Sequence, residues 1–303
     1  MFTCLIDQAV FPTEYALHSH ISRRLKVKLE DYYARYFPRK DLLTGEPIKF
    51  KEKDVYFHSL FNSRANLINY LKVSDNPEKI IKETLALRKQ LKELHFAPST
   101  IECRTSLLPT PFMVKSLGFN FNEICEDLGF DVRYDYQQQL SFEEQTPLKV
   151  LIDTREQNPL KFKNSVVSKL DFGDYTTTSH YKRVFVERKS LIDLLGTLSG
   201  GFERFEREMQ RAADMEAYVV VCVEEPLRSL DDYKDRPEFK KVKATTEFIS
   251  SRMRTICQSF DNVQFLFVNG RQELGAAISK IFRMNNLISN TDLQFYYDTR
   301  CLV

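Results

Sequence analysis

The fold of this chain is decided by residues 173–189, which read GDYTTTSHYKRVFVERK. The pattern predicts a β-hairpin whose two strands flank a turn at residues 180–182. Side chains two positions apart in a strand share a face, so Glu187 and Lys189 project the same way. The hairpin also brings the carboxylate of Asp174 alongside that of Glu187. We therefore expect two carboxylates and one ammonium group in one small space.

These three side chains suit the hydrolysis of a phosphodiester bond. Such hydrolysis uses a divalent metal to neutralise charge on the phosphate and to lower the pKa of a bound water. The carboxylate oxygens of Asp174 and Glu187 are hard ligands of the kind that magnesium or manganese prefers. Lys189 would orient or help deprotonate the attacking water, or stabilise the charge that develops. Upstream, residues 149–153, KVLID, predict an apolar strand that ends in Asp153, a third acid for this site.

Four segments together resemble the nuclease domain of the XPF, Mus and Hef endonucleases: IDTRE at 152–156, GDY at 173–175, ERKS at 187–190 and DL at 193–194. The resemblance implies a restriction-endonuclease-like α/β fold, in which helices flank a central mixed sheet. It also implies that Asp174 and Glu187 hold metal and that Lys189 is catalytic. Asp153 would be a further metal ligand and catalytic acid, and Asp193 would assist catalysis.

The residues after the hairpin keep the alternation of an α/β core. The apolar run at 217–223 predicts a strand buried on both faces, and residues 263–268 predict another strand. Helices are expected at 202–215, 245–260 and 271–283. These elements place the predicted nuclease domain at residues 148–303, after a polar linker at 141–147 that ends in proline.

Two mainly helical modules are expected before the linker. Residues 1–74 form a basic and aromatic module, and residues 75–140 form a second module with a helix at 77–93. Two short helical segments, at 111–118 and 121–130, resemble the helix-turn-helix repeats associated with homing endonucleases. A packing unit with no DNA role is the alternative, because the second of these segments is acidic.

The first module also resembles a degenerate ββα zinc finger, with Cys4, Asp7, His18 and His20 as its candidate ligands. A finger uses two cysteines and two histidines at closing distances, and His18 and His20 are only two positions apart. We therefore expect no zinc here, and histidines on a helix surface instead.

The charge distribution indicates where DNA would bind. The net charge is only +2, but Lys and Arg outnumber Asp and Glu in residues 1–120 and are outnumbered in residues 121–303. A basic half supplies phosphate contacts, which give affinity but little sequence information; a solvated basic face with no partner is the alternative. The candidate DNA-binding residues are Arg23, Arg24, Arg35, Arg39, Lys40, Lys115, Arg188, Arg204 and Arg207.

The composition predicts a soluble cytoplasmic protein. Hydrophobic residues make up 43% of the chain and charged residues 28%, as in an ordinary globular protein. We expect no signal peptide and no transmembrane segment. The six cysteines are scattered without a CxxC pair, which predicts reduced thiols. We also expect no small-molecule cofactor and no membrane partner.

The sequence therefore predicts a magnesium- or manganese-dependent endonuclease that acts on double-stranded DNA. The main hypothesis is site-selective cutting of the homing or phage type, directed by the N-terminal modules. One alternative is a structure-specific endonuclease that acts on branched DNA in replication, recombination or repair. Another is an inactive DNA-binding or scaffolding protein. One site cuts one strand, so a monomer would nick and a homodimer would cut both strands.

Overall fold

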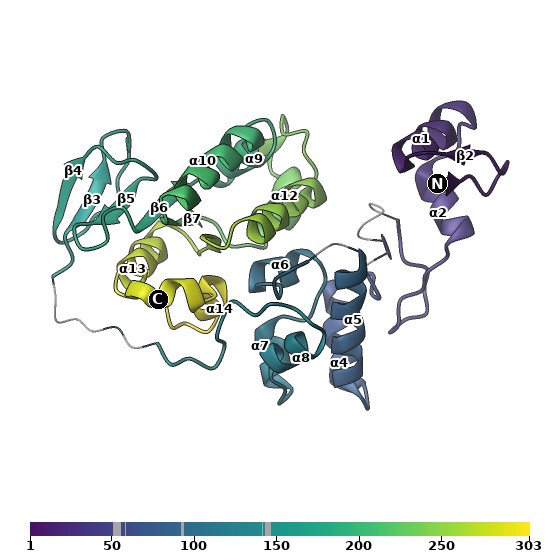
Figure 1. Cartoon of the computed structure of the whole chain (residues 1–303), viewed down its shortest axis with the longest axis horizontal. Coiled ribbons are helices and arrows are strands. Elements are labelled where there is room, and N and C mark those ends of the chain that lie inside the picture. The colour runs from purple at the N-terminus through teal and green to yellow at the C-terminus, as the bar shows by residue number, and fades with distance from the viewer. Residues whose placement is uncertain (51–55, 58, 92–93, 141, 143–146) are drawn as a thin grey trace. The chain divides into compact units, whose positions relative to one another are not determined.

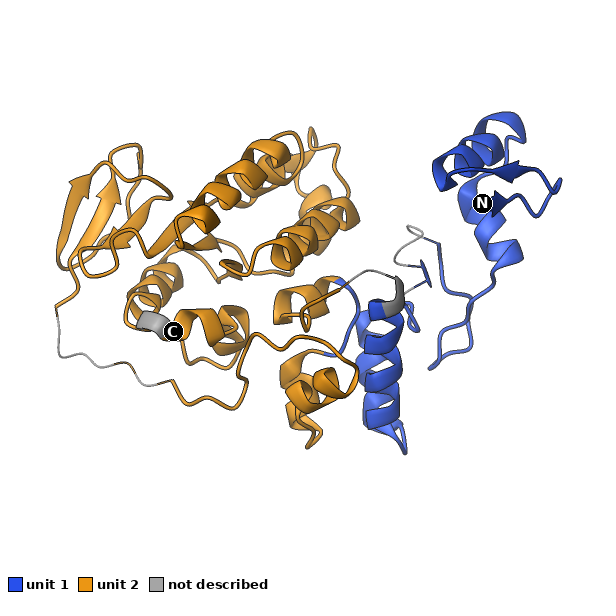
Figure 2. Ribbon diagram, in the orientation of Figure 1, with its two compact units in different colours: residues 1–93, 106–109 blue, residues 94–105, 110–303 orange. Residues whose placement is uncertain are grey.

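A computed structural model describes residues 1–50, 56–57, 59–91, 94–140, 142 and 147–303. They form two compact units, shown in different colours in Figure 2: residues 1–93 with 106–109, and residues 94–105 with 110–303. The boundaries of these two units differ from the domain boundaries that we predicted near residues 74 and 141. Residues 141 and 143–146 of the predicted linker lie outside the described residues.

The first unit begins with a ββα arrangement. Strands β1 and β2 pair antiparallel, and Thr13 caps the helix that follows by accepting a hydrogen bond from the Ala16 backbone. A core of buried apolar and aromatic side chains, including Leu17, Ile21 and Tyr32, holds this part together. The elements of the unit are β1 (Phe2–Thr3), β2 (Val10–Phe11), α1 (Glu14–Ser19), the π-helix η1 (His20–Arg24), α2 (Leu29–Tyr36), α4 (Arg64–Val73) and α5 (Pro77–Leu91).

The second unit is built on a six-stranded mixed sheet with the strand order β4-β3-β5-β6-β7-β8. Strand β5 runs antiparallel to both neighbours, and the other adjacent strands are parallel. The strands are β3 (Val150–Asp153), β4 (Ser165–Ser168), β5 (Tyr175–Thr177), β6 (Val184–Lys189), β7 (Tyr218–Val223) and β8 (Val263–Phe267). The predicted hairpin is β5 and β6. The predicted α/β class, with a central mixed sheet, is confirmed.

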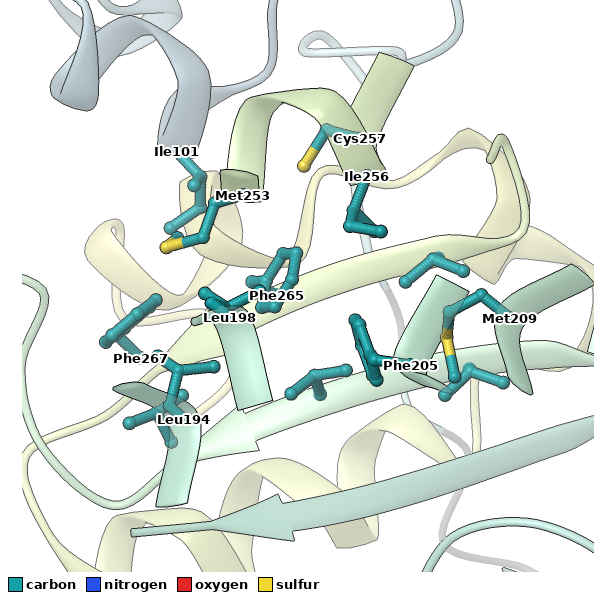
Figure 3. Packing of buried hydrophobic residues seen from close by; sticks show 14 of the residues in the cluster. Ile101, Leu194, Leu198, Phe205, Met209, Met253, Ile256, Cys257, Phe265 and Phe267 are labelled. Carbon is teal, nitrogen blue, oxygen red and sulfur yellow. The ribbon is translucent and has the colours of Figure 1, made fainter. Parts of the chain in front are cut away.

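Helices cover both faces of this sheet (Figure 1). Alternate residues of β7 point to opposite faces, and every residue of β7 is buried, which explains its continuous apolar sequence. Helices α9, α10 and α12 pack with β7 and β8 in one large hydrophobic cluster (Figure 3). The helices are α9 (Leu191–Leu198), α10 (Phe202–Asp214), α11 (Ser229–Asp232), α12 (Thr246–Ser259), α13 (Arg271–Ile281) and α14 (Leu293–Asp298), with 3₁₀ turns at Tyr233–Asp235, Pro237–Phe239 and Asn285–Asn290.

The predicted helix-turn-helix block does not stand apart from this unit. The predicted segments 111–118 and 121–130 form α7 (Pro111–Ser116) and α8 (Phe121–Asp127), and α6 (Thr100–Thr105) precedes them in the same module. Ile101 of α6 lies in the same hydrophobic cluster as α12 (Figure 3). The buried carboxylate of Asp292, just before α14, accepts hydrogen bonds from the Thr100 backbone and from the Tyr136 hydroxyl. Arg133 donates to the backbone carbonyl of Cys257. The block is therefore packed into the unit that carries the sheet.

Within the described residues, every helix is too short or too polar to span a bilayer.

Candidate active site

The entry to strand β5 depends on Gly173. Its backbone φ is +58°, in the left-handed region that favours glycine. A Cβ atom at this position would lie 2.7 Å from the carbonyl oxygen of Val186, closer than real Cβ contacts allow. The next amide, that of Asp174, donates to the same carbonyl at 2.8 Å. The absence of a side chain at Gly173 therefore lets the chain approach β6 closely enough to fix Asp174.

We expect Gly173→Ala to destabilise the protein by about 2–3 kcal/mol, because left-handed strain and the Val186 clash act together. The matched control is Gly118→Ala, whose φ of +85° is also left-handed but whose Cβ would meet nothing within 4 Å. Urea unfolding followed by circular dichroism measures both variants. Equal losses in the two would show that the close approach to Val186 has no energetic effect.

The carboxylate of Asp174 is held against strand β6. The backbone N–H of Arg188 donates to Asp174 Oδ2 at 2.7 Å. Arg188 lies between Glu187 and Lys189, and Lys189 Nζ donates to Glu187 Oε1 at 2.8 Å. The three predicted side chains are therefore connected through one stretch of β6.

The carboxylates of Asp174 and Glu187 repel each other in this group. Burial, followed by repulsion from the Glu187 carboxylate, raises the pKa of Asp174 to about 7. The hydrogen bond from Arg188 and the charge of Lys189 act in the opposite direction but do not cancel the effect. Two carboxylates thus lie close enough for one to disfavour ionisation of the other, with the Lys189 ammonium beside them.

The backbone of Asp153 is hydrogen-bonded to this group, whereas its carboxylate has other partners. Its N–H donates to the Asp174 carbonyl at 2.8 Å, but its side chain is only 1% exposed. Asp153 Oδ1 accepts from the backbone N–H and from Nε of Arg155, and Oδ2 accepts from the Leu170 backbone. Burial works to raise the pKa of Asp153, but these hydrogen bonds outweigh it and lower that pKa below its ordinary value. Both carboxylate oxygens are thus engaged within the protein.

Asp193 lies in the first turn of α9, whose N-cap is Ser190. Its backbone N–H donates to Ser190 Oγ at 3.2 Å, and the Ser190 hydroxyl donates to Asp193 Oδ2 at 2.5 Å. The arrangement satisfies the free end of the helix and places a negative charge where the helix dipole favours it.

Sequence reasoning missed a chain of ion pairs beside the site. Arg188 donates two hydrogen bonds to Glu156, at 2.8 and 3.1 Å, and also pairs with Glu224 at 3.2 Å. Glu224 in turn pairs with Arg271 at the start of α13, and Arg271 donates to the Asn158 backbone. A sequence signal existed for Glu224, because it directly follows the apolar run at 217–223, at the carboxyl end of a predicted buried strand.

The candidate DNA-binding residues fall into two groups. Arg39, Lys115 and Arg188 are committed to protein partners: Arg39 donates to the Phe57 carbonyl and Lys115 to the Tyr136 carbonyl. Lys115 is nevertheless exposed, as are Arg23 and Arg24 on η1, Arg35 on α2, Lys40, and Arg204 and Arg207 on α10. These two groups differ in how freely a side chain could reach a phosphate.

The residues that contain the hairpin match the model of a known domain family. The model of the ERCC4 domain matches residues 152–281. XPF from Aeropyrum pernix in complex with DNA is a similar solved structure, at 19% identity and a TM-score of 0.36, over 45% of this chain and 64% of that one. XPF from the same organism in another structure matches at 18% identity and a TM-score of 0.32, over 46% of this chain and 61% of that one.

These alignments span less than two thirds of either XPF chain. A search of curated proteins found no match. The hairpin motif, the strands around it and the matched family model agree on one assignment: residues 152–281 of this chain are an ERCC4 domain.

Proposed function

We propose that this chain is a divalent-metal-dependent DNA endonuclease and that branched DNA is its preferred substrate. The observation that carries the proposal is the group formed by Asp174, Glu187 and Lys189 on β5 and β6, within the residues that match the ERCC4 domain. The alternative of an inactive scaffold is less favoured, because all three side chains are present and connected.

The donor set fits magnesium or manganese. Asp174 and Glu187 offer hard carboxylate oxygens and no sulfur or nitrogen ligand, and they carry excess negative charge. A bound ion would neutralise charge on the phosphate and lower the pKa of a water for attack. Lys189, already beside Glu187, would hold that water or stabilise the charge on the phosphate oxygens.

We assign supporting roles to the two other predicted acids. Asp153 positions the loop of Arg155 and the backbone of Asp174, since both of its oxygens are engaged. Asp193 accepts a hydrogen bond from Ser190, the N-cap of α9, and so supports the start of that helix. With Asp153 and Asp193 in these roles, Asp174 and Glu187 are the two acidic metal ligands of the proposed site.

The packing of the middle block favours branched DNA over a specific sequence. A sequence-reading helix must present its side chains to a groove. The exposed face of α8 carries Glu123, Glu126 and Asp127, which would repel phosphates. With α6 buried against α12, the block is better suited to extending the nuclease core than to reading bases.

The test compares a flap, a fork and a linear duplex of the same sequence, each with Mg²⁺, with Mn²⁺ and with EDTA. We expect cleavage of the flap and fork that requires metal, and at least about 10-fold slower cleavage of the linear duplex, or about 1.4 kcal/mol. Equal rates at one specific sequence in all three substrates would favour site-selective cutting.

The matched variants are Glu187→Gln in the site and Glu203→Gln on the exposed side of α10. We expect cleavage to be lost in the first and retained in the second. Wild-type protein that binds DNA but cuts none of the three substrates would support the scaffold alternative and refute the enzyme.

A further inference from the structure

A second group of side chains of the kinds that bind metal lies in the first unit, outside residues 152–281, which match the ERCC4 domain. The ligand atoms of Cys4, Asp7 and His20 all lie within 4.8 Å of one another. His20 Nε2 and Asp7 Oδ2 are 2.8 Å apart, and the Cys4 side chain is also hydrogen-bonded to Asp7. A thiol, a carboxylate and an imidazole therefore converge on one point.

Backbone hydrogen bonds and ring packing hold these three residues in place. Cys4 and Asp7 lie in the turn between β1 and β2, where the Cys4 N–H donates to the Ala9 carbonyl and the Gln8 N–H donates to the Cys4 carbonyl, both at 2.8 Å. His20 begins the π-helix that continues α1, and its ring packs against Phe11 with centroids 4.7 Å apart. The three ligands thus come from a hairpin turn and a helix.

The spacing of the three residues matches that of a zinc site. Two positions separate Cys4 from Asp7 and twelve separate Asp7 from His20, as between the first three ligands of a Cys₂His₂ site. In such a site three to five residues separate the third ligand from the fourth, which would place the fourth ligand at Arg24, Leu25 or Lys26 of this chain.

We predicted no zinc here because His18 and His20, taken as two ligands of one site, are only two positions apart. The structure separates these two histidines, because His18 Nε2 lies 2.7 Å from the Tyr33 hydroxyl and is not part of the group. The spacing between His18 and His20 therefore has no bearing on whether a metal binds.

From this arrangement we infer that Cys4, Asp7 and His20 bind one zinc ion, with water as the fourth ligand. Zinc is the metal that a thiolate, an imidazole and a carboxylate suit best, whereas magnesium avoids sulfur. On binding, the Cys4 thiol releases its proton to solvent, and the hydrogen bonds to Asp7 are exchanged for metal–ligand bonds.

The exposure of the three side chains indicates how the ion would enter. Cys4 is fully buried and the His20 side chain is 8% exposed, but the Asp7 side chain is 37% exposed. The ion would therefore reach the site past Asp7, on the side where the water ligand remains. The bound ion would tie the β1–β2 turn to the helix, and three protein ligands would hold it less tightly than four.

The test titrates the full-length, metal-free chain with Co²⁺, followed by competition with Zn²⁺. A thiolate ligand gives cobalt a sulfur charge-transfer absorption that the carboxylates of the nuclease site cannot produce. We expect one equivalent of cobalt to develop this absorption and one equivalent of zinc to displace it. The readout is independent of DNA cleavage, so it stands or fails separately from the proposed nuclease activity.

Three variants identify the ligands. Cys4→Ser should abolish the absorption, and Asp7→Asn and His20→Gln should weaken binding by more than the roughly 10–100-fold that losing an outer partner of a metal ligand costs. His18→Gln and Cys301→Ser are the controls, because His18 bonds to Tyr33 and Cys301 is an exposed thiol elsewhere in the chain. Both should bind as the wild type does.

Two results would overturn the inference. The first is wild-type protein that shows no sulfur charge-transfer absorption with cobalt at any ratio, which would mean that the hydrogen-bonded group functions without metal. The second is an absorption that persists in Cys4→Ser and disappears in Cys301→Ser. If a variant fails to fold, the cobalt–sulfur absorption of the wild type and of Cys301→Ser decides the question, because the carboxylates of the nuclease site cannot produce it.

Discussion

Replacing Asp174 by Asn should reduce metal-dependent DNA cleavage by about 10²–10³-fold or more, the loss that follows removal of one charge-stabilising group from an active site. The amide keeps the size of the side chain and can still accept the hydrogen bond from the Arg188 backbone, which is 2.7 Å from Asp174 Oδ2. It removes the negative charge that would attract the ion. Single-turnover cleavage of a flap substrate at saturating Mg²⁺ measures the loss.

The same replacement should make the metal-free protein more stable above neutral pH. Because burial and Glu187 raise the pKa of Asp174 to about 7, the folded state favours the protonated acid. The stabilisation that this provides is fully present below the ordinary Asp pKa of about 4 and is lost as the pH rises through about 7. Asn cannot ionise, so Asp174→Asn should gain on the order of 2 kcal/mol over the wild type at about pH 8.

The matched control is Asp171→Asn, the same chemical change at an exposed position three residues earlier. It should change neither cleavage nor the pH dependence of unfolding. Thermal unfolding in EDTA between acidic and alkaline pH measures the stability of all three proteins. Wild-type stability that does not fall as the pH rises through 7 would show that burial and Glu187 do not raise the pKa of Asp174 in the folded protein.

The hairpin and the inner strands could be predicted because their patterns are local. The apolar first half of β6 and the unbroken apolar run of β7 are buried on both faces, which a short window of sequence records. Strand β4 was missed because SVVS is short and largely exposed at the edge of the sheet. Helix α14 was missed because its burial depends on contacts with residues far away, such as Thr100 with Asp292.

The candidate site shows the same limit. The sequence indicated which acids lie near the hairpin, but the number of hydrogen bonds that each accepts depends on loops that fold back from elsewhere. Asp153 and Asp193 fit the pattern as well as Asp174 does. Only the structure shows that the Leu170 backbone engages Asp153 and that Ser190 engages Asp193. The sequence also could not show that His18 is outside the Cys4 group, because its hydrogen-bond partner, Tyr33, lies in α2.

Arg188→Gln should destabilise the protein by about 3 kcal/mol, because it leaves the buried Glu156 carboxylate without its cation and leaves Glu224 with Arg271 alone. The Arg188 side chain is 16% exposed, and its partners Glu156 and Glu224 are 4% and 20% exposed. Glutamine can donate at most to one of them and carries no charge. Urea unfolding measures the change, and the pair of variants Glu156→Gln and Glu156→Gln/Arg188→Gln measures how strongly the two residues are coupled.

The control Arg204→Gln makes the same change on the exposed side of α10 and should alter stability by no more than about 0.5 kcal/mol. DNA affinity in EDTA then separates the two roles that an arginine could have. If Arg188 supports the fold, its loss leaves the affinity of the folded protein nearly unchanged, because its guanidinium is occupied by Glu156 and Glu224. Arg204, which is free to reach a phosphate, should instead weaken binding and reduce its salt dependence. A stable Arg188→Gln protein with weakened DNA binding would reverse this assignment and return Arg188 to the DNA-binding surface.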